Sequence, residues 1–176
     1  MELLNYEVLK KSGYEGYILE SAPEKVMQFG EGNFLRAFVD YWFDVANEKA
    51  GWNGKCVLVQ PIPQGLTDMI NAQEGLYTLY LRGRENGEKV DRKRVISSVS
   101  RCVNPYEKEG FDAMMELAVS DDLEYIVSNT TEAGIVYDPE CRIEDEPCSS
   151  FPGKLTQVLY ARYKAGKSGL VILSCE

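Results

Sequence analysis

Two short segments of this sequence carry the residue types best suited to chemistry. The first, Gly30-Glu-Gly-Asn-Phe-Leu35, follows an apolar run and precedes a helical pattern. Gly30 allows a tight turn, and Gly32 allows the backbone to approach a pyrophosphate, whose charge then faces free N–H groups of the helix. Leu35 replaces the third glycine of G-x-G-x-x-G, so we expect helix and strand to lie slightly farther apart. We interpret the segment as a nucleotide-binding turn; the alternative is a plain strand-to-helix turn.

The second segment, Ser128-Asn-Thr-Thr-Glu-Ala-Gly134, directly follows another apolar run. In a doubly wound fold, ligands bind beyond the carboxyl ends of the strands. Asn129, Thr130 and Thr131 can hydrogen-bond a ribose or a nicotinamide, and Glu132 can orient a water or a substrate hydroxyl. The same residue types also form N-caps and turns, so that interpretation stays open.

The choice of cofactor is not decided by the residues after the second apolar run. An acidic residue at the end of that strand normally accepts hydrogen bonds from the ribose of NAD. No Asp or Glu occurs between Cys56 and Gly65, and Gln60 occupies the expected position. A neutral amide can bond a ribose hydroxyl, but it neither repels nor attracts a 2'-phosphate, so NAD and NADP both remain open.

Composition excludes several classes of function. The 176 residues include 28 Asp and Glu against 19 Lys and Arg, a net charge of −9, which argues against nucleic acid as a partner. Without histidine, the chain alone cannot provide a His base, a Ser-His-Asp triad or a His-ligated metal. The five cysteines form no C-x2-C pair, so we expect reduced structural thiols and no metal site. We find neither a signal peptide nor a membrane span, and we predict a cytoplasmic protein.

Hydrophobic periodicity indicates an α/β fold of the Rossmann-like, doubly wound type: a mostly parallel sheet with an antiparallel hairpin excursion. The helix after the glycine turn has two adjacent apolar stripes and a polar face opposite them. The first stripe is Phe34, Phe38, Trp42 and Val45, the second is Leu35, Val39, Phe43 and Ala46, and the polar face is Arg36, Asp40, Asp44 and Asn47. We predict one domain over residues 1–176, in which 1–24 form a lead segment. The expected elements are strands at 25–29, 56–59, 123–127 and 169–174, a hairpin of 76–82 with 90–101 around Asn86-Gly87, and helices at 33–49, 106–119 and 151–165, the last with Ser150 as N-cap.

The chain ends two residues after its last predicted buried strand. In an open α/β sheet, a complete enzyme would continue from such a strand into a loop and another element. We therefore expect this sequence to be the front part of a longer protein.

Three motifs, in order, resemble one known family. They are Phe29-Gly-Glu-Gly-Asn-Phe-Leu-Arg-Ala-Phe38, Ser128-Asn-Thr-Thr-Glu-Ala-Gly-Ile135 and Phe151-Pro-Gly-Lys-Leu-Thr156, with Gly75-Leu-Tyr-Thr78 and Arg82-Gly83 between them. Together they resemble the tagaturonate reductases, also called altronate oxidoreductases, of the mannitol dehydrogenase family. The similarity runs from about Lys25 to the last residue.

The resemblance implies an NAD-dependent, metal-independent reductase that converts tagaturonate, a small sugar acid, to altronate in hexuronate breakdown. It implies an N-terminal Rossmann-type domain and a helical C-terminal domain that holds the catalytic lysine, so we expect no catalytic residue in this chain. Relatives continue beyond an equivalent Cys-Glu into the active site, which places Glu176 in its vicinity. The cofactor segment carried over is Val26, Met27, Gln28, Phe29, Gly30, Glu31, Gly32, Asn33, Phe34, Leu35, Arg36 and Ala37.

Other functions remain open at this stage. Within the same class, the candidates are fructuronate reductase and a mannitol-type polyol dehydrogenase. A non-catalytic module that senses NAD(H) belongs to another class, and a purely structural interaction domain is a third possibility. The polar cluster at the strand ends argues against the last of these.

Overall fold

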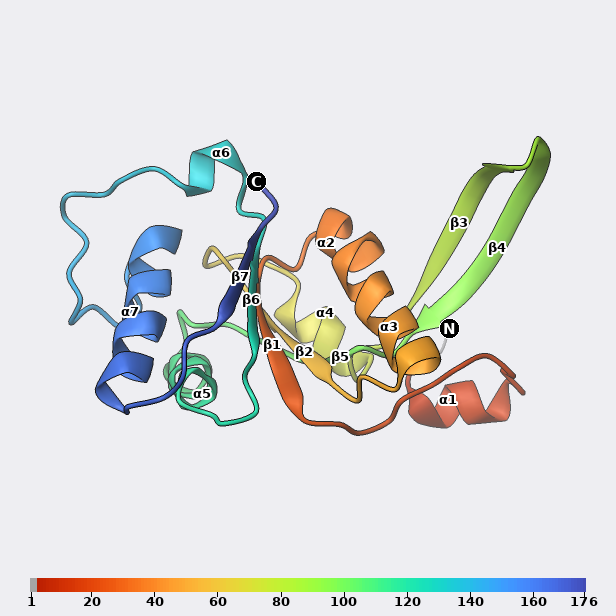
Figure 1. Cartoon of the computed structure of the whole chain (residues 1–176), viewed down its shortest axis with the longest axis horizontal. Coiled ribbons are helices and arrows are strands. Elements are labelled where there is room, and N and C mark those ends of the chain that lie inside the picture. Colours follow the sequence, from red (N-terminus) through yellow and green to blue (C-terminus); the bar gives the residue numbers. More distant parts are fainter. Residues whose placement is uncertain (1–2) are drawn as a thin grey trace.

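A computed structural model describes residues 3–176, apart from the side chains of Glu132 and Ala133. Helices and strands alternate along most of the chain (Figure 1). In order they are α1 Tyr6–Lys11, β1 Glu24–Phe29, α2 Asn33–Ala37, α3 Val39–Ala50, β2 Lys55–Val59, α4 Thr67–Ala72, β3 Tyr77–Glu85, β4 Glu88–Ile96, β5 Val99–Val103, α5 Lys108–Ala118, β6 Tyr125–Ser128, α6 Thr131–Gly134, α7 Phe151–Lys164 and β7 Val171–Ser174.

The main sheet has five parallel strands in the order β5-β2-β1-β6-β7. From β1 the chain passes outward to β2 and β5, and it then returns to the other edge of β1 to form β6 and β7. The direction of strand order therefore reverses between β1 and β6. The predicted Rossmann-like, mostly parallel sheet is confirmed.

Side chains of β1 alternate between two layers of core because successive residues of a strand point to opposite faces. Met27 and Phe29 pack with buried residues of α5 and α7. Val26 packs in a second cluster with residues of α2, α3 and α4. Figure 1 shows α5 and α7 on one side of the sheet and α2 and α3 on the other.

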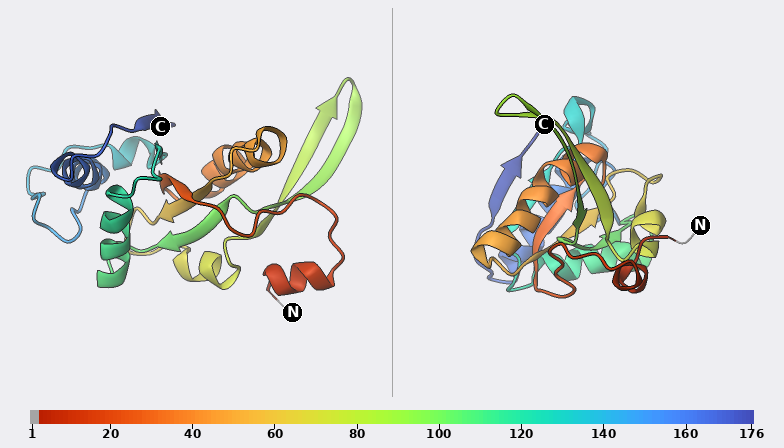
Figure 2. Two further views of the ribbon diagram at one scale, coloured as in Figure 1. Left: turned by 60° about the horizontal axis from the view of Figure 1, so that its bottom comes forward. Right: turned by 90° about the vertical axis from the view of Figure 1, so that its right-hand side faces the viewer.

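The predicted hairpin is confirmed, with one difference. Strands β3 and β4 pair antiparallel and project away from the main sheet (Figure 2). Asn86 and Gly87 at their turn have φ of 51° and 87°, the positive values that a type I′ turn requires. The extended run that we predicted to end at Arg101 is divided, because its last part forms β5 in the main sheet.

The predicted single helix over 33–49 is broken at Phe38, and only one of its two predicted apolar stripes faces the core. Leu35 and Val39 are buried and Phe43 packs against them, as predicted, but the stripe that contains Trp42 is exposed and the polar face is buried in its place. Phe38 has φ −115° and ψ −71°, and it separates α2 from α3. Asp40 and Asp44 are fully buried, whereas Trp42 is 56% exposed. The polar face can be buried because it finds partners: Asp44 accepts hydrogen bonds from the N–H and hydroxyl of Ser97.

The last strand is also more exposed than predicted. All four residues of β7 are exposed, so the prediction of a buried strand was wrong. An apolar groove of about 630 Å³ runs between α3 and β7, and its lining includes Phe38, Trp42 and Leu173. The apolar run predicted a strand correctly, but sequence alone does not say what covers it. No helix among residues 3–176 is long and apolar enough to cross a membrane.

Candidate functional site

A hollow of about 670 Å³ lies at the carboxyl ends of β1 and β6, where the strand order reverses. This is the position at which open α/β sheets bind ligands. Its walls come from the glycine turn, the loop after β2, the segment after β6 and the start of α7. The lining residues are Gly30, Glu31, Gly32, Asn33, Phe34, Pro61, Ile62, Gln64, Asn129, Thr130, Thr131, Gly134, Val136, Tyr137, Asp138, Ser149, Ser150 and Phe151.

Gly30 is required by the backbone. Its φ is +122°, a value that other residues rarely adopt, and its N–H donates to the carbonyl of Val59 at 3.1 Å. A Cβ here would lie 3.1 Å from the carbonyl oxygen of Asn129 and 3.2 Å from Cδ1 of Leu35. The missing side chain therefore lets the turn lie against the end of β6. Leu35, in the place of the third glycine, is buried beneath this turn.

Gly32 leaves space rather than filling it. It is exposed, it caps the N-terminus of α2, and a Cβ added to it would meet nothing within 4 Å. Among the described residues, no side chain caps the first-turn N–H groups of α2. Arg36 holds the turn in shape, because its Nε donates to the Glu31 carbonyl at 2.9 Å and its Nη2 donates to Oδ1 of Asn33 at 2.8 Å.

Glu31 brings a carboxylate to a place where the sequence showed none. It is 7% exposed and lies between the glycine turn and the loop after β2. A Cβ added to Gly65 in that loop would collide with Oε1 of both Glu31 and Gln60. Burial raises the pKa of Glu31, and the backbone N–H of Leu66 and the charge of Arg36 offset part of this rise. Glu31 thus stands beside the end of β2.

Gln60 holds the loop after β2. Its Nε2 donates to the carbonyls of Ile62 and Pro63 at 2.8 and 3.0 Å, and its Oε1 accepts from the hydroxyl of Thr67 at 2.9 Å. It is 2% exposed and does not line the hollow. Gln60 lies beside Glu31 at the end of β2 but outside the lining of the hollow, and its contact with a ribose stays a prediction.

Asn129, Thr130 and Thr131 do line the hollow. Nδ2 of Asn129 donates to the carbonyl of Cys175 at 2.6 Å, which joins the ends of β6 and β7. The buried Oγ1 of Thr130 has no hydrogen-bond partner within the described part of the chain. Thr131 has φ of 63°, an unusual value for a β-branched residue. Unpartnered and strained groups of this kind occur at ligand sites.

The two predicted acidic residues near the substrate differ in what can be said of them. The side chain of Glu132 lies outside the described structure, so its proposed role stays a prediction. Glu176 accepts hydrogen bonds from the hydroxyls of Ser128 and Ser174 at 3.0 and 2.7 Å and from the N–H of Thr130 at 3.2 Å. Burial raises its pKa, but these hydrogen bonds bring the pKa below its ordinary value. Glu176 therefore does not line the hollow but fixes the segment after β6 that forms one of its walls.

Of the predicted cofactor segment, only residues 30–34 line the hollow; Leu35 and Arg36, which support the turn, lie outside the lining, and so do the remaining members. Val26, Met27, Gln28 and Phe29 are buried in β1, and Ala37 is exposed at the end of α2. Gln28 supports the turn from below, since its Nε2 donates to the carbonyl of Gly30 at 3.1 Å.

Sequence reasoning missed one wall of the hollow and the loop after β2. The missed residues lie after strand ends or at the start of α7, and the rule that ligands bind beyond strand ends was the available signal. Gly134 and Phe151 belonged to motifs already noted, although neither was named as a site residue. The ring of Phe151 packs on Phe29 with centroids 5.2 Å apart. The missed residues are Pro61, Ile62, Gln64, Gly134, Val136, Tyr137, Asp138, Ser149, Ser150 and Phe151.

The chemistry of the lining is that of a binding site. It offers backbone N–H groups, hydroxyls, amides and the carboxyl groups of Glu31 and Asp138. Within residues 3–176, no lysine or arginine lines the hollow. The arrangement can recognise a polar ligand by hydrogen bonds and by close approach of the backbone.

Comparison with known proteins shows extensive similarity to altronate oxidoreductases. The chain is 46% identical to that of Phocaeicola vulgatus over all of its length and 36% of the relative's. It is 49% identical to that of Bacteroides thetaiotaomicron over 88% of this chain and 33% of the relative, and 45% identical to that of Bacillus subtilis over 96% of this chain and 35% of the relative. The chain thus spans about a third of the length of these curated relatives.

Two solved structures share the fold. Mannitol 2-dehydrogenase of Pseudomonas fluorescens, in a ternary complex with NAD and D-mannitol, superposes with a TM-score of 0.78 at 22% identity, covering 98% of this chain and 38% of that one. A substrate-free D-sorbitol dehydrogenase gives a TM-score of 0.73 at 20% identity, covering 98% and 39%. The family model described as the mannitol dehydrogenase Rossmann domain matches residues 24–176. This chain therefore belongs to the mannitol dehydrogenase family, whose Rossmann domain it contains.

Proposed function

We propose that this chain is the NAD(H)-binding part of an oxidoreductase that reduces tagaturonate to altronate with NADH. The observation that carries the proposal is the open backbone at Gly32, which faces a hollow at the point where the strand order reverses. The names of the curated relatives support the substrate, and the NAD complex of the structural neighbour supports the cofactor.

The residues present fit a dinucleotide. A Cβ at Gly30 would make a tight contact with the end of β6, the space at Gly32 is open, and Oγ1 of Thr130 lacks a partner among the described groups. In this proposal, Gly30 and Gly32 bring the backbone against the pyrophosphate and the first turn of α2. Asn129, Thr130 and Thr131 bond the half of the cofactor that carries the nicotinamide. When bound, NADH supplies the hydride that reduces a ketone.

Glu31 favours NAD over NADP in this proposal. Its carboxyl group stands beside the end of β2, where an acidic residue commonly accepts hydrogen bonds from the adenosine ribose. A 2'-phosphate placed there would meet like charge. Gln60, with its amide already engaged, keeps the loop that borders this position in place.

Proton donation and recognition of the anionic sugar are assigned to other parts of the whole protein. Among the described residues, the hollow has no cationic side chain to bind a uronate carboxylate. We propose that residues 1–24 form a lead segment, that a helical C-terminal domain supplies the catalytic groups, and that the protein works in the cytoplasm. The 176-residue chain then binds the cofactor without significant turnover.

Calorimetric titration of the chain with NADH and with NADPH tests the cofactor site. We expect NADH to bind more tightly, and Gly32→Val to weaken NADH binding by about tenfold or more, because its side chain enters the space that the pyrophosphate needs. Gly83→Val in β3 is the matched control, because a Cβ there also meets nothing within 4 Å. Unfolding temperatures equal to that of the wild type would show that both variants fold. Equal NADH affinities for the two variants would refute the assignment.

Assays of the full-length protein test the substrate. We expect NADH-dependent reduction of tagaturonate to exceed that of fructuronate and fructose. Preference for one of the latter would assign the protein to fructuronate reduction or to mannitol-type dehydrogenation. NADH binding without turnover of any of the three would favour the sensing module.

A further inference from the structure

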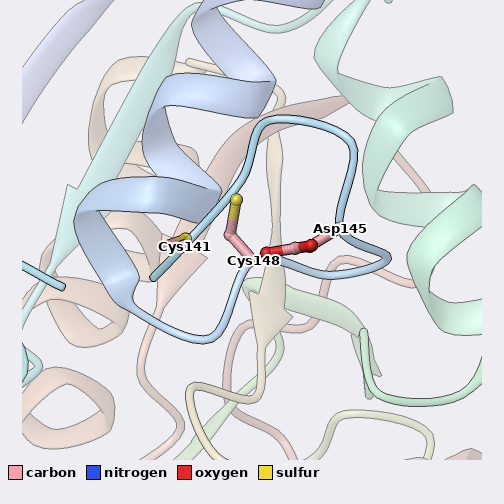
Figure 3. Close-up of side chains that lie close together, drawn as sticks. All are labelled: Cys141, Asp145 and Cys148. Atoms are coloured by element: carbon pink, nitrogen blue, oxygen red, sulfur yellow. The ribbon is translucent and has the colours of Figure 1, made fainter. Parts of the chain in front are cut away.

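A pair of thiols outside the hollow is brought together by the loop that precedes α7. Ligand atoms of Cys141, Asp145 and Cys148 all lie within 4.8 Å of one another (Figure 3). The two cysteines are seven positions apart and form no familiar metal or redox spacing in the sequence. The fold, rather than a short motif, creates the pair.

Both sulfurs rest on the first turn of α7. A Cβ added to Gly153 would lie 2.5 Å from Sγ of Cys141 and 3.1 Å from Sγ of Cys148, so the glycine makes room for both. Gln157 of α7 anchors the loop: its Oε1 accepts from the N–H of Cys148 at 3.1 Å, and its Nε2 donates to the carbonyl of Ile143 at 3.0 Å. The loop that carries the two thiols is therefore fixed against α7.

The two thiols have different surroundings. Both line a hollow of about 290 Å³, but Cys141 is partly exposed and Cys148 is 1% exposed. Burial raises the pKa of Cys141, but hydrogen bonds from Cys148 and Ser150 outweigh it, and the pKa is lowered. Burial, and then the hydrogen bond and charge of Cys141, raise the pKa of Cys148 to about 12. An accessible thiol of lowered pKa beside a second thiol is an arrangement found for a reactive and a resolving cysteine.

Two sources of positive charge lie beside the thiols. The N-terminus of a helix carries partial positive charge, and both sulfurs lie against that of α7. The buried ammonium group of Lys154 also interacts with both thiols, and burial lowers its pKa to about 8. Both positive groups stabilise an anionic sulfur, and the carboxylate of Asp145 acts against them by raising the pKa of Cys148.

We propose that Cys141 and Cys148 are a modification site, which forms a reversible disulfide by exchange with a low-molecular-weight disulfide. The thiolate of Cys141 attacks one sulfur of R–S–S–R, whose S–S bond breaks and releases RS⁻, which takes up a proton. Cys148 then loses its proton to water and attacks Sγ of Cys141, and the second RS⁻ leaves and is protonated. Two protein thiols are oxidised by two electrons, and one small disulfide is reduced to two thiols.

Formation of the mixed disulfide on Cys141 makes deprotonation of Cys148 easier. Once the Sγ of Cys141 is bound in the mixed disulfide, its negative charge no longer raises the pKa of Cys148. The resulting disulfide closes a loop whose neighbours belong to the candidate cofactor site. Tyr137, Asp138 and Ser150 line both the hollow beside the thiols and the larger hollow at the strand ends.

Equilibration of the chain with glutathione and its disulfide, followed by alkylation and peptide mass spectrometry, tests the proposal. We expect a disulfide that links the peptide of Cys141 to the peptide of Cys148. Cys56, Cys102 and Cys175 should stay reduced and be found as alkylated peptides. Cys148→Ser should retain glutathione on Cys141, because the second step is lost. Cys175→Ser, which changes another partly exposed thiol, should leave the 141–148 disulfide unchanged.

Three results would overturn the proposal. The first is full alkylation of Cys141 and Cys148 in the wild type after oxidation that links dithiols of a control protein such as thioredoxin. The second is glutathione that persists on wild-type Cys141 without forming the internal bond. The third is protection of both thiols from alkylation by one equivalent of Zn²⁺ in the wild type but not in Asp145→Asn, which would show a metal site.

Discussion

Replacement of Asp40 by Asn should remove part of the pH dependence of stability. Asp40 lies in α3 beneath the glycine turn, with no exposed surface. Its Oδ2 accepts long hydrogen bonds from Nε2 of Gln28 at 3.5 Å and from the hydroxyl of Tyr77 at 3.4 Å. Its Oδ1 has no partner among the described groups. Asparagine keeps the shape and an acceptor at this position but carries no charge.

Burial, only partly offset by these hydrogen bonds, raises the pKa of Asp40 from 3.8 to about 7. The folded protein therefore holds this proton more tightly than the unfolded chain does. Its contribution is most favourable below about pH 4 and is lost as the pH rises toward about 7. At about 1.4 kcal/mol per pKa unit, the loss between about pH 5 and about pH 8 is roughly 2–3 kcal/mol.

Urea unfolding of the wild type and Asp40→Asn at both pH values measures this difference. We expect the free energy of unfolding of the variant, relative to the wild type, to increase by about 2–3 kcal/mol from the lower to the higher pH. Asp122→Asn, at an exposed position, is the control and should follow the wild type. Parallel pH profiles for the wild type and Asp40→Asn would show that Asp40 is ionised in the folded protein throughout this range.

Three further predictions concern stability, each measured by urea unfolding. Arg162→Met should lower the free energy of unfolding by about 3–5 kcal/mol, because the buried guanidinium donates to four backbone carbonyls that would lose their partner. A loss below about 1 kcal/mol would contradict this. Asn47→Ala should lower the free energy of unfolding by about 2 kcal/mol, and Trp42→Ser by less than about 1 kcal/mol, because α3 buries its polar face and exposes Trp42. A larger loss for Trp42→Ser than for Asn47→Ala would refute that orientation of α3. Gly30→Ala should lower the free energy of unfolding by about 1–3 kcal/mol, because Gly30 has a positive φ and lies in contact with β6. The same loss in Gly32→Ala, where the added Cβ makes no such contact, would argue against this cause.

The order of elements was predictable because buried parallel strands appear as short apolar runs between glycines and prolines. The burial of the polar face of α3 was not predictable, because most of its partners come from other elements, some of them about 50 positions farther along the chain. Asp44, for example, accepts from Ser97 and pairs with Arg94. The exposure of β7 was equally hidden, since an apolar run looks the same whether or not its outer edge is covered.

For the candidate site, local sequence predicted what local geometry determines. The special backbone at Gly30 and the lining roles of Asn129 and Thr130 followed from their places after strand ends. The position of Glu31 beside the end of β2 depends on how two loops pack, and no spacing rule contains that information. The second wall, including Tyr137 and Ser150, comes from an irregular segment without periodicity.

The central place of β1 in the sheet has a consequence for folding kinetics. One edge of β1 pairs with β2 soon after it in the chain, but the other edge pairs Phe29 with Ser128, 99 positions away. Closing so long a loop costs entropy before its contacts can repay it, which slows folding. We expect strands β1, β2 and β5 to assemble early and β6 to add late. The hollow, which needs the ends of both β1 and β6, then forms only in the last stage of folding.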